Sequence, residues 1–262
     1  GQRKVGQFTF AFEDITVPMQ GIPVTVTRSY DSFDKTVGDF GVGWKMALGA
    51  GVRIQRTKPL GKDWHARTID PVPWGGHALE TENPAKVLVT YADGSQDRFE
   101  VRARFVNPWF PDDADVYFEP IGKTRSRLYP LGDSMLRYEY GMLVDLVGDP
   151  TVPYDPDQFL LVTQEGYELA IWRSKGLKSI TDPNGNTVYF GSYGIIHSSG
   201  FQVFFERDGQ GRISRIFAPD VPEVRYTYDD RGNLESFTDQ SGQRWIYGYD
   251  SDHNLLSVID PR

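Results

Sequence analysis

The residues that most often bind metals lie far apart along this chain. It has four histidines and no cysteine, so neither a thiolate metal site nor a disulfide can form. His65 and His77 would need an acidic partner to hold a metal, and such an unmatched pair is more often two loop residues. His197 and His253 lie elsewhere in the chain. We therefore expect no metal site and no cofactor.

Acidic residues cluster at Asp112–Asp115 and at Asp155–Asp157. Oxygen ligands at this spacing suit Ca²⁺, but neither cluster has the full twelve-residue calcium loop, so we expect solvated acidic loops. No pair among the 36 acidic residues is singled out for glycoside hydrolysis. The serine elbow, the phosphate loop and the zinc-binding helix are all missing from the sequence. We expect no enzyme.

Aromatic side chains suggest a different kind of site. Trp74, Trp109, Trp172 and Tyr189 are candidates for stacking on sugars, although packing in a core or between repeats is the commoner use of such rings. A cell-surface adhesion or carbohydrate-binding β module is therefore the alternative function.

The overall charge excludes two classes of partner. The formal net charge of −8 argues against nucleic acid and against an anionic membrane, because both need a basic surface. No apolar run approaches the roughly 20 residues that span a bilayer. The chain opens at Gly1 rather than at Met, which favours a piece of a longer protein.

The elements that position these residues are predicted to be strands. Aromatic residues make up 14% of the chain, with 27 glycines and 17 prolines, a composition typical of many short strands joined by turns. Side chains alternate with the period of a strand in several segments. The apolar members of these alternations are Phe8, Phe10 and Phe12; Ile22, Val24 and Val26; Phe99, Val101, Ala103 and Phe105; and Leu136, Tyr138 and Tyr140. Asp93-Gly94 predicts a hairpin turn before Arg98–Phe105.

Three proline-rich stretches interrupt this pattern. We interpret residues 57–85 and 107–133 as long loops or insertions, and residues 148–157 as a boundary. The predicted domains are therefore an N-terminal β-rich segment over residues 1–157 and a repeat region over residues 158–262.

The repeat region has a period of 21 residues. Three sets of positions follow it, namely Asp208, Asp229 and Asp250; Ile213, Leu234 and Leu255; and Phe205, Tyr226 and Tyr247. Leu177 precedes Ile213 by 36 residues, so about 15 extra residues around Gly191 to Gly200 separate an upstream copy. Each copy predicts a strand, a turn and a strand, with Gly211 and Gly232 free to take positive φ in the turn. Hairpins of this kind must stack on their neighbours to bury a face.

The repeated core Tyr-Asp-x-x-Gly-x-Leu resembles the YD repeat of Rhs proteins, which occurs in bacterial polymorphic toxins, insecticidal toxin-complex shells and teneurins. Tyr228–Leu234 is a full match, and Tyr249–Leu255 departs from it only at His253, where glycine is usual. The copy at Asp208 has Arg207 in place of tyrosine.

The N-terminal part resembles the segment that precedes these repeats in bacterial Rhs proteins. Arg28, Tyr30 and Ser32 fit its Arg-x-Tyr-x-Ser strand, and Phe40–Trp44, with Gly41 and Gly43, fits its FGxGW element. Tyr91–Ser95 followed by Phe99 fits its DG hairpin.

This resemblance implies an all-β fold in which antiparallel hairpin repeats form part of a spiralling β-sheet shell after an N-terminal β-rich segment. The function it implies is structural: the shell encapsulates or displays a C-terminal toxin or effector segment of the same polypeptide. The partners are then the rest of the shell, that segment and components of a secretion system, and the location is secreted or at the cell surface. The autoproteolytic aspartate site found in the family is not in this chain, so we expect no self-cleavage.

Overall fold

The computed structural model describes residues 7–47, 52–69, 75–91, 94–132 and 135–261. None of these residues is helical, and the strand pairings among them are antiparallel, which confirms the predicted all-β class. The described residues accordingly contain no helix that could cross a membrane. The chain divides into two compact units, with residues 1–49 and 184–262 in unit 1 and residues 50–183 in unit 2.

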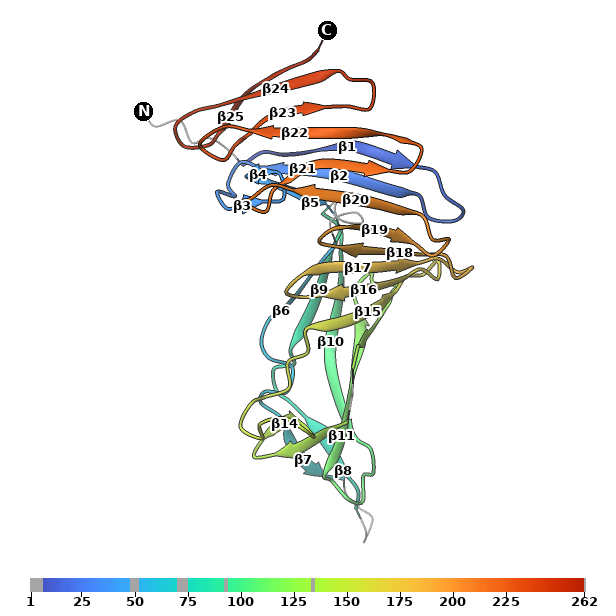
Figure 1. Ribbon diagram of the computed structural model, residues 1–262. Helices are drawn as coiled ribbons and strands as arrows, with labels where there is room; N and C mark the ends of the chain where they lie inside the picture. Colours follow the sequence, from blue (N-terminus) through green and yellow to red (C-terminus); the bar gives the residue numbers. More distant parts are fainter. Residues whose placement is uncertain (1–6, 48–51, 70–74, 92–93, 133–134, 262) are drawn as a thin grey trace. The chain divides into compact units, whose positions relative to one another are not determined.

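Unit 1 begins with a 3-stranded sheet of order β1-β2-β5, which we call the N-terminal sheet. Its strands are β1 (Thr9–Val17), β2 (Val24–Asp31) and β5 (Trp44–Ala47), and the short pair β3 (Val37–Gly38) and β4 (Gly41–Val42) precedes β5 (Figure 1). The predicted alternation is present, because Val24 and Val26 are buried and the Phe10 ring packs edge-on against Trp44, with 5.7 Å between their centroids.

The second part of unit 1 is a meander in which each strand pairs with the next along the chain. We call it the repeat sheet. Its strands are β18 (Thr187–Gly191), β19 (Gly194–His197), β20 (Gln202–Arg207), β21 (Ile213–Ala218), β22 (Val221–Tyr228), β23 (Leu234–Thr238), β24 (Arg244–Tyr249) and β25 (Leu255–Ile259). The strands β21, β23 and β25 begin at Ile213, Leu234 and Leu255, as the 21-residue period predicts.

The extra residues of the upstream copy add strands to this meander. Three strands, β18 to β20, lie along the chain between β17 (Gly176–Thr181) and β21, whereas β22 alone separates β21 from β23. An insertion into an antiparallel meander must add an even number of strands if the following copy is to keep its direction. The roughly 15 extra residues therefore supply one additional hairpin.

Unit 2 contains a 6-stranded sheet of order β14-β13-β11-β10-β9-β6 and the hairpin β7-β8. The strands of the sheet are β6 (Arg53–Arg56), β9 (Lys86–Thr90), β10 (Gln96–Phe105), β11 (Asp113–Ile121), β13 (Leu136–Glu139) and β14 (Met142–Asp145), and the hairpin is β7 (His65–Thr68) with β8 (His77–Glu80). β12 (Arg127–Pro130) pairs with β15 (Gln158–Val162), which pairs with β16 (Glu168–Trp172) and through it with β17. The alternation predicted for β10 is confirmed, because Phe99, Val101, Ala103 and Phe105 are all buried.

Two of the predicted long loops carry strands, so that interpretation was wrong. Residues 57–85 contain β7 and β8, and residues 107–133 contain β11 and β12. On one side, β11 pairs with β13 only through Asp113 and Ala114. Pro120 lies outside this paired part, so its missing N–H removes no hydrogen bond to β13. The alternation predicted for Leu136, Tyr138 and Tyr140 ends one residue pair early. Tyr140 is a turn residue at φ 49° rather than a strand residue. Asp93, in the predicted hairpin turn, lies outside the described residues.

The division into units does not follow the predicted boundary after residue 157. That position falls inside unit 2, between β14 and β15. The N-terminal sheet groups with the repeat sheet, far away in the sequence, because the two share the buried contacts described next.

Candidate functional site: the seam of unit 1

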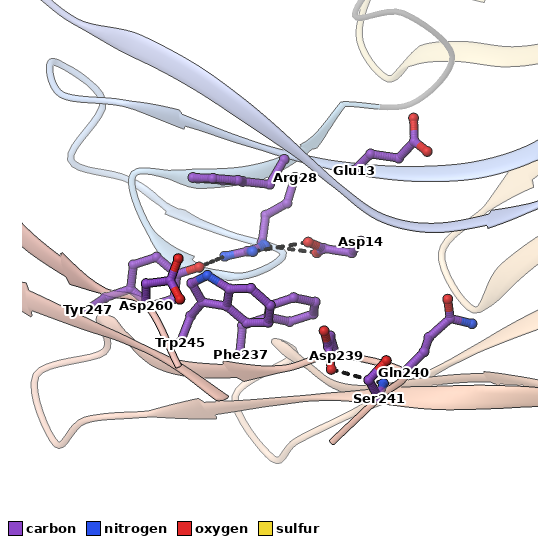
Figure 2. Close-up of a pocket in the computed structure, with 11 residues that line it drawn as sticks. Glu13, Asp14, Arg28, Phe237, Asp239, Gln240, Ser241, Trp245, Tyr247 and Asp260 are labelled. Carbon is purple, nitrogen blue, oxygen red and sulfur yellow. Dashed lines mark hydrogen bonds and ion pairs between the residues drawn. The ribbon is translucent and has the colours of Figure 1, made fainter. Parts of the chain in front are cut away.

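The N-terminal sheet packs on β21 to β25 along an interface that we call the seam. At its centre, Arg28 on β2 is buried and donates from Nε and Nη2 to the two carboxylate oxygens of Asp14, at 2.8 and 3.0 Å (Figure 2). Arg28 Nη1 donates to the Tyr247 hydroxyl at 3.1 Å, and the Tyr226 hydroxyl donates to Asp14 at 2.7 Å. The buried ion pair is therefore hydrogen-bonded to two strands of the repeat sheet.

Aromatic rings from both sheets surround the Arg28 guanidinium. Its central carbon lies 4.7 Å from the ring centroid of Phe237, 4.8 Å from Trp44 and 5.4 Å from Phe12. Burial alone would lower the pKa of Arg28, but the charge and hydrogen bonds of Asp14 outweigh it and raise that pKa. Burial, together with the charge of Asp14, raises the pKa of Tyr226 well above its usual value. The arginine stays charged and the tyrosine stays a hydrogen-bond donor.

Gly41 of the FGxGW element lets the chain approach a repeat turn closely. Gly41 has φ 91°, and a Cβ there would lie 2.6 Å from the carbonyl oxygen of Gly232. The next residue, Val42, donates its N–H to that same oxygen at 3.1 Å. Gly43 also has positive φ, and a Cβ there would lie 2.9 Å from the Tyr30 ring. The element therefore forms a backbone contact with a repeat turn that no side chain would allow.

The other N-terminal motif residues also reach the seam or support it. The Tyr30 hydroxyl donates to the His253 carbonyl at 3.2 Å and accepts from the Leu255 N–H at 3.0 Å. Trp44 Nε1 donates to the Tyr249 hydroxyl at 2.8 Å. The hydroxyl of buried Ser32 accepts the Phe8 N–H at 3.0 Å, within the N-terminal sheet.

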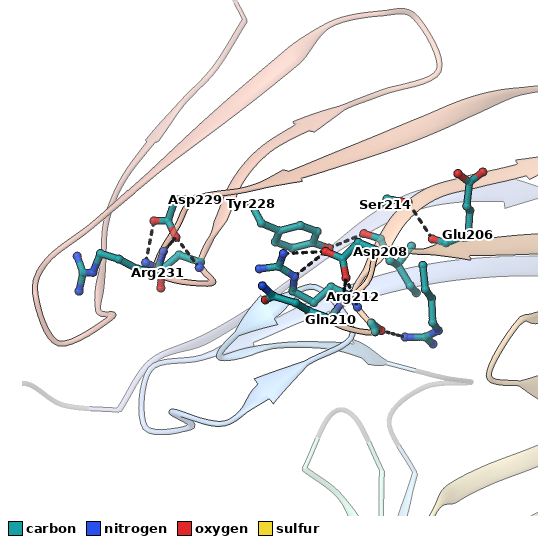
Figure 3. Close-up of polar contacts among 12 residues, drawn as sticks. Glu206, Asp208, Gln210, Arg212, Ser214, Tyr228, Asp229 and Arg231 are labelled. Carbon is teal, nitrogen blue, oxygen red and sulfur yellow. Dashed lines mark hydrogen bonds and ion pairs between the residues drawn. The ribbon is translucent and has the colours of Figure 1, made fainter.

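The repeated aspartates close the repeat turns. Asp208 Oδ1 accepts the N–H groups of Gln210 and Arg212, both at 2.9 Å, and Asp229 makes the same pair of bonds two and four residues on (Figure 3). Asp250 makes the equivalent pair of bonds to Asp252 and Asn254. Gly211 and Gly232 occupy the third position after the aspartate with φ 82° and 85°. Burial would raise the pKa of Asp208, but its bonds to Arg212 lower it below the usual value. These aspartates recur because each turn needs its own.

Coverage of the repeat sheet ends at its last strands. Ile213 and Ile216 are fully buried, and so is Leu234, whereas Leu255 is only half-buried and Val258 is 42% exposed. Among the described residues, β25 pairs only with β24. The apolar repeat positions are thus buried on β21 to β24 and become partly exposed on β25.

A cavity of about 470 Å³ opens beside Arg28, between β1 and β23 to β25. Its walls include Trp245 and Phe237 and the carboxylates of Glu13, Asp239 and Asp260. Both Asp239 and Asp14 carry structural bonds: Asp239 accepts the N–H groups of Ser241 and Gln243, and Asp14 is taken by Arg28 and Tyr226. The cavity thus borders groups that already hold the seam and a turn together.

The structure brings the motif residues of both chain ends to one interface. Arg28, Tyr30, Gly41 and Trp44 of the N-terminal set meet the repeat set at the seam, whereas Gly43 and Ser32 make their contacts within the N-terminal segment. Sequence reasoning missed Asp14. The β1–β2 register shifts between Glu13 and Ile15, and this bulge interrupts the alternation that would have marked Asp14 as facing inward. The only signal was that a buried arginine needs a carboxylate.

The candidate metal and calcium residues do not gather. His65 pairs with Glu80 and Thr68 with His77, so the two histidines lie at opposite ends of the β7–β8 hairpin. No group of three potential ligands occurs among the described residues. Asp155 binds Arg56 and Arg173 instead, and Asp157 accepts from the Ser174 N–H at 2.8 Å.

The candidate sugar-stacking rings have different surroundings. Trp172 lies beneath Lys175 and Lys178, whose Nζ atoms are 4.7 and 5.0 Å from its ring. Trp109 and Tyr189 are exposed, and Trp74 lies outside the described residues.

The fold and the seam define an all-β repeat protein whose hairpins are capped at one face by a separate N-terminal sheet. Residues 228–262 match the family model described as RHS Repeat, and residues 4–99 match the model described as Domain of unknown function (DUF6531). The match at residues 228–262 supports the resemblance of the repeat region to the Rhs/YD-repeat family. No curated protein gave a significant match.

Proposed function

We propose that this chain is the entry part of a bacterial Rhs shell that encloses or displays a C-terminal toxin or effector segment of the same polypeptide. The proposal makes the chain a scaffold that is secreted or located at the cell surface. Its binding partners are then further shell repeats, the enclosed segment and components of a secretion system.

The carrying observation is the graded coverage of the repeat sheet. The repeat positions are buried as far as Tyr247 on β24, while Val258 on β25 is partly exposed and, among the described residues, β25 pairs with β24 alone. Such an edge pairs readily with another strand. Another hairpin of the same 21-residue pattern would continue the sheet and keep the inner positions dry.

Limited proteolysis of the full polypeptide that contains this chain tests the proposal. The segment after the repeats should resist protease for much longer than the same segment expressed alone. Asp14→Asn, which leaves Arg28 charged and unpaired in the seam, should shorten that protection, whereas Asp155→Asn in unit 2 serves as the matched control. Equal digestion of the enclosed and the free segment would rule the shell function out.

The proposal assigns the chain no catalysis of its own. Purified chain incubated at neutral pH should therefore keep its mass, as followed by mass spectrometry. Cleavage at one defined bond that still occurs after the chain has been purified a second time would show instead that the chain is an enzyme acting on itself.

A further inference from the structure

The cavity beside Arg28, which we call the acidic cavity, has one wall that departs from the repeat pattern. Val224 and Val203 lie one and two periods of 21 residues before Trp245, and they are 0% and 1% exposed. Trp245 shares the inner face of β24 with Tyr247, yet it remains partly exposed where it lines the cavity. A valine suffices to close the sheet in the earlier copies, so the larger ring calls for another explanation.

Asp239, in the turn after β23, also differs from the aspartates of the other repeat turns. In those turns Oδ2 accepts a hydrogen bond from the side chain four residues on, which is arginine after Asp208 and asparagine after Asp229 and Asp250. Asp239 Oδ1 makes the usual pair of backbone bonds, but no side chain among the described residues donates to its Oδ2. The turn therefore accounts for only one of the two carboxylate oxygens of Asp239.

Negative charge dominates the walls of the acidic cavity. Arg28 and Asp14 neutralise each other, because the guanidinium donates to both carboxylate oxygens. Three further carboxylates line the cavity, those of Glu13, Asp239 and Asp260. Neither Glu13 nor Asp239 forms an ion pair with another residue that the structure describes. Apolar walls strengthen the field of such charges, so the cavity attracts a cation.

The aromatic walls select among cations. A guanidinium stacks on aromatic rings and has five N–H donors in one plane, so it can use a ring face and several carboxylates together. The structure already holds one guanidinium in this way, because the central carbon of Arg28 lies 4.7 Å from the ring centroid of Phe237. The Trp245 ring lies beside Phe237, with 5.6 Å between their centroids, and offers a second ring next to the first (Figure 2).

We propose that the acidic cavity binds a guanidinium group, carried by an arginine side chain or by a small molecule, a role separate from the shell. Trp245 supplies the ring face on the repeat sheet, and Phe12, 37% exposed, supplies one on the N-terminal sheet. Asp239 and Glu13 accept the N–H groups. The volume of about 470 Å³ lies within the range of ligand pockets and has room for the guanidinium with its alkyl chain.

Calorimetric titration of the whole chain with Nα-acetylarginine amide tests this proposal, because the only charge of this probe is on its guanidinium. Nα-acetylcitrulline amide has nearly the same shape without the charge, and Nα-acetyllysine amide places the charge on an ammonium. Calcium chloride tests whether the carboxylates bind a metal ion instead. Butylguanidinium and a blocked glycyl-arginyl-glycine tripeptide compare a small molecule with an arginine in a polypeptide.

Two variants change the cavity and one serves as the control. Asp239→Asn keeps an oxygen for the turn N–H groups and removes the charge, and Trp245→Val restores the residue of the earlier copies. Asp229→Asn is the matched control, because Asp229 makes the same turn bonds as Asp239 but does not line the cavity. Circular dichroism checks that each variant keeps the native fold.

The arginine probe should bind, with roughly tenfold weaker affinity in Asp239→Asn and in Trp245→Val and unchanged affinity in Asp229→Asn. The citrulline and lysine probes should bind more weakly than the arginine probe. Tighter binding of the tripeptide than of butylguanidinium would identify a polypeptide as the source of the guanidinium, and the reverse order would identify a small molecule.

Four results would overturn the proposal. They are no binding of the arginine probe, equal binding of the citrulline or lysine probe, tighter binding of calcium, and equal losses of affinity in Asp239→Asn and Asp229→Asn.

Discussion

Two arginine–aspartate pairs of the same chemistry lie in very different surroundings in this chain. Arg28–Asp14 in unit 1 has 1% and 0% of its side-chain surface exposed, whereas Arg56–Asp155 in unit 2 has 24% and 21%. The first pair is caged by aromatic rings of two sheets, and the second shares its carboxylate with Arg173 near solvent. The difference indicates that the stability of the seam depends strongly on the Arg28–Asp14 pair, whereas the stability of unit 2 depends much less on the Arg56–Asp155 pair.

The largest expected effect is the loss of the buried carboxylate. Asp14→Asn leaves the Arg28 charge without a counterion in a site that excludes water, which should cost about 3–5 kcal/mol of unfolding free energy. Asp155→Asn, the same change at the partly exposed pair, should cost about 1 kcal/mol or less. Urea denaturation followed by circular dichroism measures both. Similar losses in the two variants would mean that burial does not set the importance of the pair.

A smaller effect is expected where the seam is formed by backbone. Gly41→Ala places a Cβ against the Gly232 carbonyl oxygen, while Gly122→Ala in unit 2 has a similar positive φ and nothing within 4 Å. The control should cost about 1–2 kcal/mol for its left-handed backbone. Gly41→Ala should cost at least about 1 kcal/mol more, because the neighbouring backbone must shift. Equal thermal midpoints for both variants would show that the close approach carries no stability.

Among the described repeat turns that follow Asp208, Asp229 and Asp250, the last has a histidine in place of glycine. His253 has φ 61°, where Gly211 and Gly232 stand in the other copies, and its Nδ1 lies 2.6 Å from Asn233 Oδ1. His253→Gly should relieve the backbone strain but lose that hydrogen bond, for a net gain of up to about 1 kcal/mol. A higher melting temperature is expected. A clear loss of stability would instead assign the histidine a necessary contact between adjacent turns.

The smallest effect is a pH dependence of the turns. The bonds from Arg212 lower the pKa of Asp208 against the effect of burial, and the Asn254 side chain lowers the pKa of Asp250. A carboxyl with a lower pKa in the folded state stabilises the fold above its unfolded pKa of about 4, and loses this contribution as pH falls through the folded value. Stability should therefore decline below about pH 4, and less steeply in Asp208→Asn. Identical acid profiles for both proteins would contradict this assignment.

Sequence reasoning recovered what depends on local pattern and missed what depends on tertiary contact. The 21-residue period placed the starts of β21, β23 and β25, because each turn needs Asp and a residue able to take positive φ. The strands within residues 57–85 and 107–133 were missed because proline tolerance depends on which strand edge is unpaired, as at Pro120. Which edge of a strand stays unpaired is decided by the tertiary structure and not by the local sequence.

For the candidate site too, local motifs were recognised from the sequence and tertiary partners were not. Motif resemblance named Arg28, Tyr30 and Trp44, yet neither it nor spacing identified Asp14 or the Tyr226 and Tyr247 hydroxyls as their partners. The two tyrosines lie more than 200 residues away in sequence from the Asp14 and Arg28 that they bond across the seam. The inward position of Asp14 depends on a bulge that no short pattern predicts.

Hydrogen–deuterium exchange on Asp14→Asn tests most directly whether the seam joins the two ends of the chain into one cooperative unit. The seam predicts that β1, β2 and β21 to β24 lose protection together in the variant, while β10 and β11 of unit 2 keep theirs. Loss confined to β1 and β2, with the repeat strands as protected as before, would contradict it.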